Sequence, residues 1–383
     1  MRYLFVTVDS AGGLYPQLAL AQRARARGHQ VRFLACRSQR SAIREAGFRV
    51  RTYIGPPDFD MGDRDGAIRD WEDDPAAAFQ ACCDHIWFGP AAAVAGHVVE
   101  EVQREPVDAL AIDYFAFGAA IAAERLGLPA TILWHTCFGE WSSWNAGLPA
   151  INAARAGLGL PSDTDVYGAY HRAARVLVFT TERFGLAIGG AELPANVRHV
   201  GPQLAPGADP GTTTGASRGT PSVLVSLSTS YQAQEGLLAR AALALGGLGV
   251  KALVTTGPAV RVEQRMPPNV EVRPWVNHSD VLSQTDLVVT HGGLGTVMTA
   301  MAHGVPLLCL PMGRDQHGNA ARAERLGCGR TADASSGVDD LRQSIARALA
   351  DPSLRTRAQE LAAECDPDAG VIELQSAARQ PIR

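Results

Sequence analysis

Residues 287–296 read Leu-Val-Val-Thr-His-Gly-Gly-Leu-Gly-Thr. The apolar run 287–290 predicts a short buried strand, and the glycines that follow it predict a tight turn into a helix. Glycine lets the backbone approach a bound group closely, and the free N–H groups at a helix start attract an anion such as a diphosphate. His291 would add a hydrogen-bond donor. A glycine turn alone is weak evidence, because any tight strand-to-helix turn can need one.

The same alternation of short strands and helices extends along the whole chain. In the second half, strands are expected at 222–227, 250–255, 270–273, 287–290 and 307–310, and helices near 233–244 and 338–350. In the first half, strands are expected at 3–8, 31–35, 109–112, 130–133, 176–179 and 197–200, and helices at 17–27 and 117–126. Buried strands that alternate with helices predict parallel sheets with right-handed crossovers. The fold class is therefore α/β, with two Rossmann-like domains.

The length of 383 residues exceeds what one hydrophobic core usually supports, so two domains are expected. Between 201 and 221, Pro, Gly, Thr, Ser and Ala dominate and no periodicity remains, which is typical of a linker. We predict a first domain at 1–203, a linker at 204–220 and a second domain at 221–365. The tail 366–383 could pack back on the first domain.

Composition excludes several classes of protein. Hydrophobic residues make up 46% of the chain, the formal charge is −4, and no basic stripe typical of nucleic-acid binding appears. The seven cysteines are scattered without metal-ligand spacing, which favours a reducing compartment. The chain enters its first strand with no signal segment, and no apolar run approaches twenty residues. We expect a cytoplasmic protein without membrane insertion; the oligomeric state is not readable.

Polar residues also follow the strand that ends near Pro311. Asp315 and Gln316 are expected at the carboxyl end of this strand, where a carboxylate beside an amide would bind sugar hydroxyls. The alternative for Asp315 is a helix N-cap.

Two further segments of the second half could contact a nucleotide. Trp275 follows a strand and could stack on a nucleobase while the backbone of Val276 contacts the base edge; the alternative is a core tryptophan. Ser228 and Thr229 end the first strand of this half, where hydroxyls could meet phosphate or ribose. Serine-rich turns also cap helices.

These motifs together are similar to a known family. Trp275, the run 291–296, Gly304-Val305-Pro306 and Asp315-Gln316 with Asn319-Ala320 resemble the donor signature of family 1 glycosyltransferases, which include bacterial antibiotic glycosyltransferases. The resemblance covers nearly the whole chain. It implies the GT-B fold, in which two domains face each other across a cleft, and inverting transfer of a sugar from UDP or dTDP without metal or cofactor.

The resemblance also implies roles for individual residues. The aromatic Trp275 would stack on the base, His291 and the loop Gly293, Leu294, Gly295 and Thr296 would hold the phosphates, and Asp315 with Gln316 would hold the sugar. Residues 221–365 would then bind the donor, and the first domain a small hydrophobic acceptor.

One position departs from the family pattern. The family carries its catalytic histidine in a Gly-His-x-x-Pro turn after strand one, and this chain has Gly13 where that histidine stands. Transfer to a hydroxyl needs a base within hydrogen-bond reach. Asp9, on the same loop, is our first choice. The alternatives are Asp113 and His135. Asp113 stands where the family often has the Asp that orients the histidine, and His135 follows the next strand. Asp9 and Asp113 could instead cap helices, and His135 could line the acceptor pocket without moving a proton.

The segment 134–144 is rich in aromatic residues. Trp134, Phe138 and Trp141, with Glu140 between them, would suit a flat acceptor beside Gly13, or could equally be packing. An acidic phenol or an electron-rich aromatic carbon would need less help from a base. We therefore leave O- and C-glycosylation of an aromatic or polyketide natural product open.

A metal-dependent transferase would need an Asp-x-Asp pair at a strand end. This Asp-x-Asp pattern occurs at residues 58–60, 163–165 and 366–368. None of the three follows a clear strand, so no metal is expected. Two other functions remain as alternatives: a nucleotide-sugar epimerase on the same fold, and a non-catalytic auxiliary partner of another glycosyltransferase. A nicotinamide oxidoreductase is disfavoured, because the turn at 8–13 lacks the Gly-x-Gly-x-x-Gly spacing.

Overall fold

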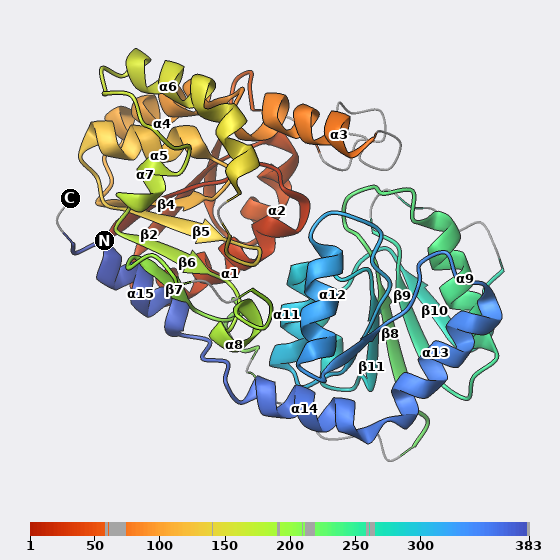
Figure 1. Ribbon diagram of the computed structural model, residues 1–383. Helices are drawn as coiled ribbons and strands as arrows, with labels where there is room; N and C mark the ends of the chain where they lie inside the picture. Colours follow the sequence, from red (N-terminus) through yellow and green to blue (C-terminus); the bar gives the residue numbers. More distant parts are fainter. Residues whose placement is uncertain are drawn as a thin grey trace. The chain divides into compact units, whose positions relative to one another are not determined.

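The computed structural model describes residues 1–57, 60, 74–139, 141–189, 192–208, 210, 219–257, 260 and 265–380. The chain divides into two compact units (Figure 1). The first comprises Met1–Phe179, Glu192–Ala205 and Asp368–Arg383, and the second Thr180–Ala191 and Pro206–Pro367. This division differs from the sequence-based boundaries at 180–191, which belong to the second unit. Most of the expected linker 204–220 lies outside the described residues.

The first unit is built on a parallel sheet of seven strands in the order β3-β2-β1-β4-β5-β6-β7. The strands are β1 Arg2–Val6, β2 Gln30–Ala35, β3 Arg49–Thr52, β4 Ala109–Asp113, β5 Ala130–Trp134, β6 Arg175–Val178 and β7 Val197–His199. The helices are α1 Leu14–Ala26, α2 Arg40–Glu45, α3 Pro75–Cys82, α4 Ala91–Arg104, α5 Phe117–Leu126, α6 Leu148–Gly157, α7 Gly168–His171 and α15 Ala369–Ala377. Short 3-10 turns at Ala11–Gly13, Arg37–Gln39 and Ser142–Gly147 and a π-helical turn at Cys83–Trp87 complete it.

Alternation of side chains along the strands fills the two faces of this sheet. Leu4 and Val6 point into one core with residues of α4, α5 and α6, whereas Tyr3 and Phe5 point into another with residues of α1 and α15. Because the sheet is covered on both faces, its central strands are buried throughout, as β4 shows with five buried residues, of which only the last, Asp113, is polar. Each βα crossover therefore places the end of a strand beside the start of a helix.

Helix α15 belongs to the first unit although it ends the chain. Its Val371 and Leu374 are fully buried in the core beside α1. Ion pairs reinforce the contact: Arg23 lies 3.1 Å from Asp368, and Arg175 lies 3.0 Å from Glu373. In Figure 1 the blue helix α15 lies near α1 and the lower strands of the first sheet. A deletion from residue 368 onward would thus expose apolar core.

The second unit repeats the architecture with a parallel sheet of six strands in the order β10-β9-β8-β11-β12-β13. The strands are β8 Ser222–Ser226, β9 Lys251–Thr255, β10 Val270–Arg273, β11 Leu287–Thr290, β12 Leu307–Cys309 and β13 Gly329–Thr331. The helices are α8 Glu182–Gly185, α9 Glu235–Gly246, α10 His278–Leu282, α11 Leu294–Ala302, α12 Gln316–Arg325, α13 Val338–Ala350 and α14 Pro352–Ala362.

The predicted α/β class and the two Rossmann-like domains are confirmed. The strands β10 and β11 and the helices α5 and α13 have the predicted bounds. The short strand β13 was not predicted, because its sequence Gly-Arg-Thr carries no apolar run. It is held at the sheet edge by pairing with β12.

Candidate functional site

The carboxyl ends of neighbouring strands bring the predicted site residues together within each unit. In the first unit β1, β4 and β5 are adjacent, and in the second β8, β11 and β12 are adjacent. Ligands of open parallel sheets bind at this edge, near the point where the strand order reverses. We therefore describe the two edges in turn.

Strands β4 and β5 place His135 beside Asp113. Nε2 of the imidazole lies 3.2 Å from each carboxylate oxygen. The side chain of Asp113 is fully buried, and that of His135 is 9% exposed. Gln17 Nε2 donates to Asp113 Oδ2 at 2.5 Å, and the backbone N–H of Phe115 donates to Oδ1 at 2.9 Å. Helix α1 and the β4 loop therefore fix the carboxylate, and the carboxylate fixes the imidazole.

Asp9 and Gly13 both lie in the turn after β1. Asp9 is 8% exposed, and its Oδ2 accepts a hydrogen bond from Ser38 Oγ at 2.7 Å. Gly13 is buried, and a Cβ at this position would fall 2.6 Å from both Cε1 and Nε2 of His135. The turn thus packs directly on the imidazole, an arrangement that the sequence did not predict.

The aromatic residues after β5 take different positions. Trp134 is 1% exposed and donates its indole N–H to the Cys137 carbonyl at 3.3 Å, so it lies in the core and not on an acceptor surface. Trp141 is 39% exposed and stacks on Trp134 with 6.1 Å between the ring centroids. The half-buried ring of Phe138 lies 5.0 Å from the ring of Trp134. Trp134 therefore supports the other two from behind, and Glu140 lies outside the described residues.

Further aromatic rings extend this surface. Trp87 stacks on Trp144 at 4.6 Å and on Phe115 at 5.4 Å, and Phe115 lies edge-on to the His135 imidazole at 5.7 Å. We call Trp87, Phe115, Trp141 and Trp144 the aromatic wall. Sequence reasoning missed Trp87 and Phe115, because they come from segments far apart in the chain and carry no shared pattern.

In the second unit, the glycine turn after β11 has the predicted strand-to-helix geometry. Gly292 has φ of +90°, a conformation that favours glycine, and a Cβ at Gly293 would fall 2.4 Å from His291 Nε2. Leu294, buried, begins α11, while Gly295 is exposed and Thr296 half-buried. The nitrogen Nε2 of His291 therefore points at the turn where an anion would bind.

Burial lowers the pKa of His291 to about 3, so this imidazole is neutral at ordinary pH. Its Nδ1 lies 3.4 Å from Thr290 Oγ1, which already accepts a hydrogen bond from the backbone N–H of Gly292. Thr290 and the Gly292 backbone therefore hold the Nδ1 side of the ring. The Ser226 carbonyl also accepts a bond from this ring.

Asp315 and Gln316 have different environments. Asp315 is exposed at the N-cap of α12 but makes no capping bond; its Oδ2 accepts from Asn319 Nδ2 at 3.1 Å. Gln316 is 2% exposed, its Oε1 accepts from the backbone N–H groups of Met312 and Gly313, and its Nε2 donates to Gln232 at 2.9 Å. Gln316 therefore braces the loop that presents Asp315, and its amide is not presented to a sugar.

The turn after β8 is contacted by one unexpected cation, which comes from the loop after β12. Ser228 is buried and bonds Ser230 at 3.0 Å, while Thr229 is exposed. Arg314 Nη1 donates to Ser230 Oγ at 2.6 Å. Arg314 has φ of +54°, which is costly for a residue with a Cβ, and its charge contributes to the lowered pKa of His291. Sequence reasoning missed it, since a single arginine beside Asp315 gave no signal.

Trp275 follows β10 and is 54% exposed, which excludes the alternative of a core tryptophan. Val276 beside it is buried. An exposed indole fixed by a buried neighbour is a suitable platform for a nucleobase.

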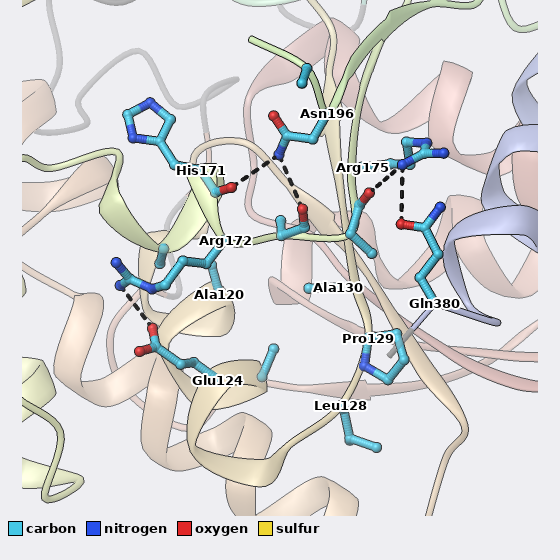
Figure 2. Close-up of a pocket in the computed structure, with 15 residues that line it drawn as sticks. Ala120, Glu124, Leu128, Pro129, Ala130, His171, Arg172, Arg175, Asn196 and Gln380 are labelled. Atoms are coloured by element: carbon cyan, nitrogen blue, oxygen red, sulfur yellow. Dashed lines mark hydrogen bonds and ion pairs between the residues drawn. The ribbon is translucent and has the colours of Figure 1, made fainter. Parts of the chain in front are cut away.

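A pocket in the first unit lies at the opposite edge of the sheet, around Ala130 and Arg175 at the amino ends of β5 and β6 (Figure 2). Its polar groups pair with one another: Arg172 with Glu124, and Arg175 with Gln380. Asn196 donates to the backbone carbonyls of Tyr170 in α7 and of Ala173 just after it. This pocket contains none of the predicted site residues.

The Asp-x-Asp pairs that the structure describes serve other contacts. Asp163 pairs with Arg172 at 2.8 Å, Asp165 accepts from the backbone N–H of Tyr167, and Asp368 pairs with Arg23; residues 58 and 59 lie outside the described residues. Among the described side chains, no group of three or more His, Cys, Asp or Glu residues could hold a metal ion. No helix in the described part of the chain is long and apolar enough to cross a membrane.

Comparisons with known proteins give a consistent result. Residues 250–374 match the family described as erythromycin biosynthesis protein CIII-like, C-terminal domain. The chain is 28% identical to 4'-demethylrebeccamycin synthase of Lentzea aerocolonigenes, over 94% of each chain, and 29% identical to the elloramycin glycosyltransferase ElmGT of Streptomyces olivaceus, over 95% of this chain and 93% of that one.

Solved structures share the fold. The calicheamicin glycosyltransferase CalG4 superimposes with a TM-score of 0.77 at 21% identity, over 98% of each chain. The glycosyltransferase VinC, solved in complex with dTDP, superimposes with a TM-score of 0.70 at 19% identity, over 99% of each chain. The fold, the matched C-terminal domain and the named relatives agree with one another. The fold is that of the GT-B glycosyltransferases, and the matched C-terminal domain together with the named relatives supports a glycosyltransferase of natural-product biosynthesis.

Proposed function

We propose that this enzyme transfers a sugar from a UDP- or dTDP-sugar, with inversion at the anomeric carbon, to a flat aromatic or polyketide acceptor. The observation that carries the proposal is the turn after β11, where Nε2 of a neutral His291 points at a glycine turn that begins α11. A neutral imidazole N–H, free backbone N–H groups and the helix dipole suit a diphosphate.

The remaining donor contacts come from the same unit. Trp275 would stack on the base, Thr229 would reach phosphate or ribose, and Asp315 would accept hydrogen bonds from the sugar. Arg314, beside Ser230 and close enough to influence His291, would stabilise the charge that develops on the leaving diphosphate. A protein cation in this place supports a reaction without a metal. The dTDP complex of VinC supports a nucleoside diphosphate of this kind.

The acceptor side is supported by the aromatic wall. The exposed ring of Trp141 and the half-buried rings of Trp87 and Phe115, with Trp144 buried among them, offer an apolar surface on which an aromatic or polyketide acceptor would stack. The names of the rebeccamycin and elloramycin relatives favour the same acceptor class. No two of the described cysteines are joined in a disulfide, which supports a reducing compartment such as the cytoplasm.

The function is tested by incubating the purified chain with UDP- or dTDP-sugars and a panel of flat phenols and aromatic polyketides, in EDTA. We expect a product heavier than the acceptor by one glycosyl residue, with the opposite anomeric configuration to the donor. Acid treatment separates the two bond types, because an O-glycoside hydrolyses and a C-glycoside survives.

Three results would contradict this proposal. Conversion of the nucleotide sugar itself without any acceptor indicates an epimerase. Activation of a second glycosyltransferase by a chain that transfers nothing indicates an auxiliary partner. Activity that EDTA abolishes and Mn²⁺ restores contradicts the metal-free mechanism.

His291→Ala should weaken the binding of UDP or dTDP. A hydrogen bond to a charged phosphate contributes about 1.5–3 kcal/mol, which corresponds to a Kd roughly 10- to 150-fold higher. Calorimetry on the full chain measures this change. The full chain is needed because residues 368–383 belong to the first unit and 180–191 to the second.

His303→Ala is the matched control for this prediction. His303 is also buried, at 1% exposure, but it follows the other end of α11 and bonds the Thr299 carbonyl. The control should lower stability and leave nucleotide affinity near the wild-type value. Equal affinities for both variants and the wild type would mean that His291 only packs.

A further inference from the structure

The space that a side chain at position 13 would occupy is already filled by the imidazole of His135. A Cβ at Gly13 would lie 2.6 Å from Cε1 and Nε2 of His135 and 2.3 Å from Ser10 Oγ. Non-bonded carbon contacts need about 3.5 Å or more, so no residue other than glycine fits while the imidazole is in place. Gly13 and His135 are therefore complementary: the absence of a side chain in one turn makes room for a ring from another strand.

The imidazole reaches this place from the carboxyl end of β5, and its partner is Asp113. Nε2 lies 3.2 Å from both oxygens of a carboxylate that Gln17 and the Phe115 backbone also hold. A carboxylate only accepts hydrogen bonds, so Nε2 carries the proton and donates it to Asp113. In a neutral ring Nδ1 then has the lone pair.

The other edge of the ring remains available for chemistry. Within the part of the chain that the structure describes, Nδ1 of His135 has no hydrogen-bond partner, and the side chain retains 9% exposure. Tyr114 and Phe115 lie edge-on to the ring at 4.6 and 5.7 Å and restrict its rotation. Nδ1 is thus an oriented basic atom beside the aromatic wall.

Asp9 has a different environment. Its carboxylate accepts from Ser38 Oγ at 2.7 Å, and the turn that contains it presents Ser10 and Gly13 to the imidazole. These contacts favour the imidazole over our first choice from the sequence.

We propose that His135 is the general base of this glycosyltransferase, that Asp113 positions it, and that the catalytic imidazole has moved from position 13 to the end of β5. The inference rests on the proposed function. Nδ1 removes the acceptor proton as the acceptor oxygen, or ring carbon, bonds to the anomeric carbon. The bond from that carbon to the diphosphate oxygen breaks, and the nucleoside diphosphate leaves with the electron pair. Asp113 stabilises the imidazolium until the proton passes to water.

The test is to move the imidazole back. His135→Gly should lower kcat by about 10²–10⁴, and Gly13→His alone should also be impaired because of the clash. The double variant Gly13→His/His135→Gly again places one imidazole near Asp113, and we expect its kcat to exceed that of His135→Gly at least tenfold. Added imidazole should likewise raise the turnover of His135→Gly, an effect that a structural role would not produce.

Each outcome has a defined meaning. Two measurements recognise misfolded variants: calorimetry of nucleotide binding reports on the second unit, and a thermal melt reports on the first. If His135→Gly is misfolded, His135→Gln is used in its place. Near-normal turnover of His135→Gly or His135→Gln overturns the inference. A loss of turnover in Asp9→Asn, while the His135 variants remain active, overturns it as well. No transfer by the wild type in the same assay refutes the proposed function instead.

Discussion

Asp113→Asn should lower the turnover number by about 10²–10⁴ while the affinity for UDP or dTDP stays unchanged. The carboxylate accepts from His135, Gln17 and the Phe115 backbone, and an asparagine has one oxygen to offer them. Its NH₂ group would face either Gln17 or the imidazole. If the NH₂ group faces His135, it donates to Nε2 and favours the imidazole tautomer with the proton on Nδ1. Nδ1 could then no longer accept a proton from the acceptor.

The measurement is kcat at saturating donor, together with nucleotide calorimetry. Asp108→Asn is the control, because Asp108 immediately precedes the same strand and pairs with Arg2 at the protein surface. An exposed pair of this kind contributes little to stability. If Asp113 acts through His135, the double variant Asp113→Asn/His135→Gly should be no slower than the slower single variant. Full turnover of Asp113→Asn would show that the imidazole needs no carboxylate partner.

Gly293→Val should raise the Kd for nucleotide roughly 10²–10³-fold. The first carbon of a side chain here would lie 2.4 Å from Nε2 and 2.7 Å from Cε1 of His291. Either the imidazole or the turn must move, so the complex would lose both the His291 bond and the backbone N–H contacts, together about 3–4 kcal/mol. Calorimetry with UDP and dTDP measures the loss.

A double-variant cycle isolates the cause of this effect. Gly293→Ala should be costly in the wild-type chain but almost neutral in a His291→Ala background, where the clashing ring is absent. Gly249→Ala serves as a control, since a Cβ there would meet no atom within 4 Å. Additive effects of the two substitutions would mean that Gly293 is required for its backbone and not for the space beside His291.

Local sequence patterns were sufficient for the framework of the donor site. The run at 287–296 predicted a strand, a glycine turn and a helix start, and the structure has β11 and α11 on either side of that turn. Such features depend on contacts within a few residues, which sequence spacing describes directly. The exposed position of Trp275 decided between two alternatives that the sequence had left open.

The directions of individual side chains were harder to predict from the sequence than the strands and turns. Trp134 and Gln316 were both expected to face a ligand, and both are buried, the first behind Trp141 and the second as a brace for the loop at 312–316. A residue at a strand end can point into the site or into the core, and the choice depends on what packs against it. The sequence pattern contains no information on that packing.

The sequence by itself determined that this chain has two parallel α/β units, where the anion-binding turn lies, and that position 13 lacks the expected histidine. Only the tertiary structure decided which side chain takes the vacant place. Ser10 and His135 are 125 residues apart, yet their side chains lie 3.4 Å from each other, because β1, β4 and β5 are neighbours in the sheet and end at the same edge. Strand order is fixed by the burial of both sheet faces over the whole unit, so the contact between Gly13 and His135 exists only once that core has formed.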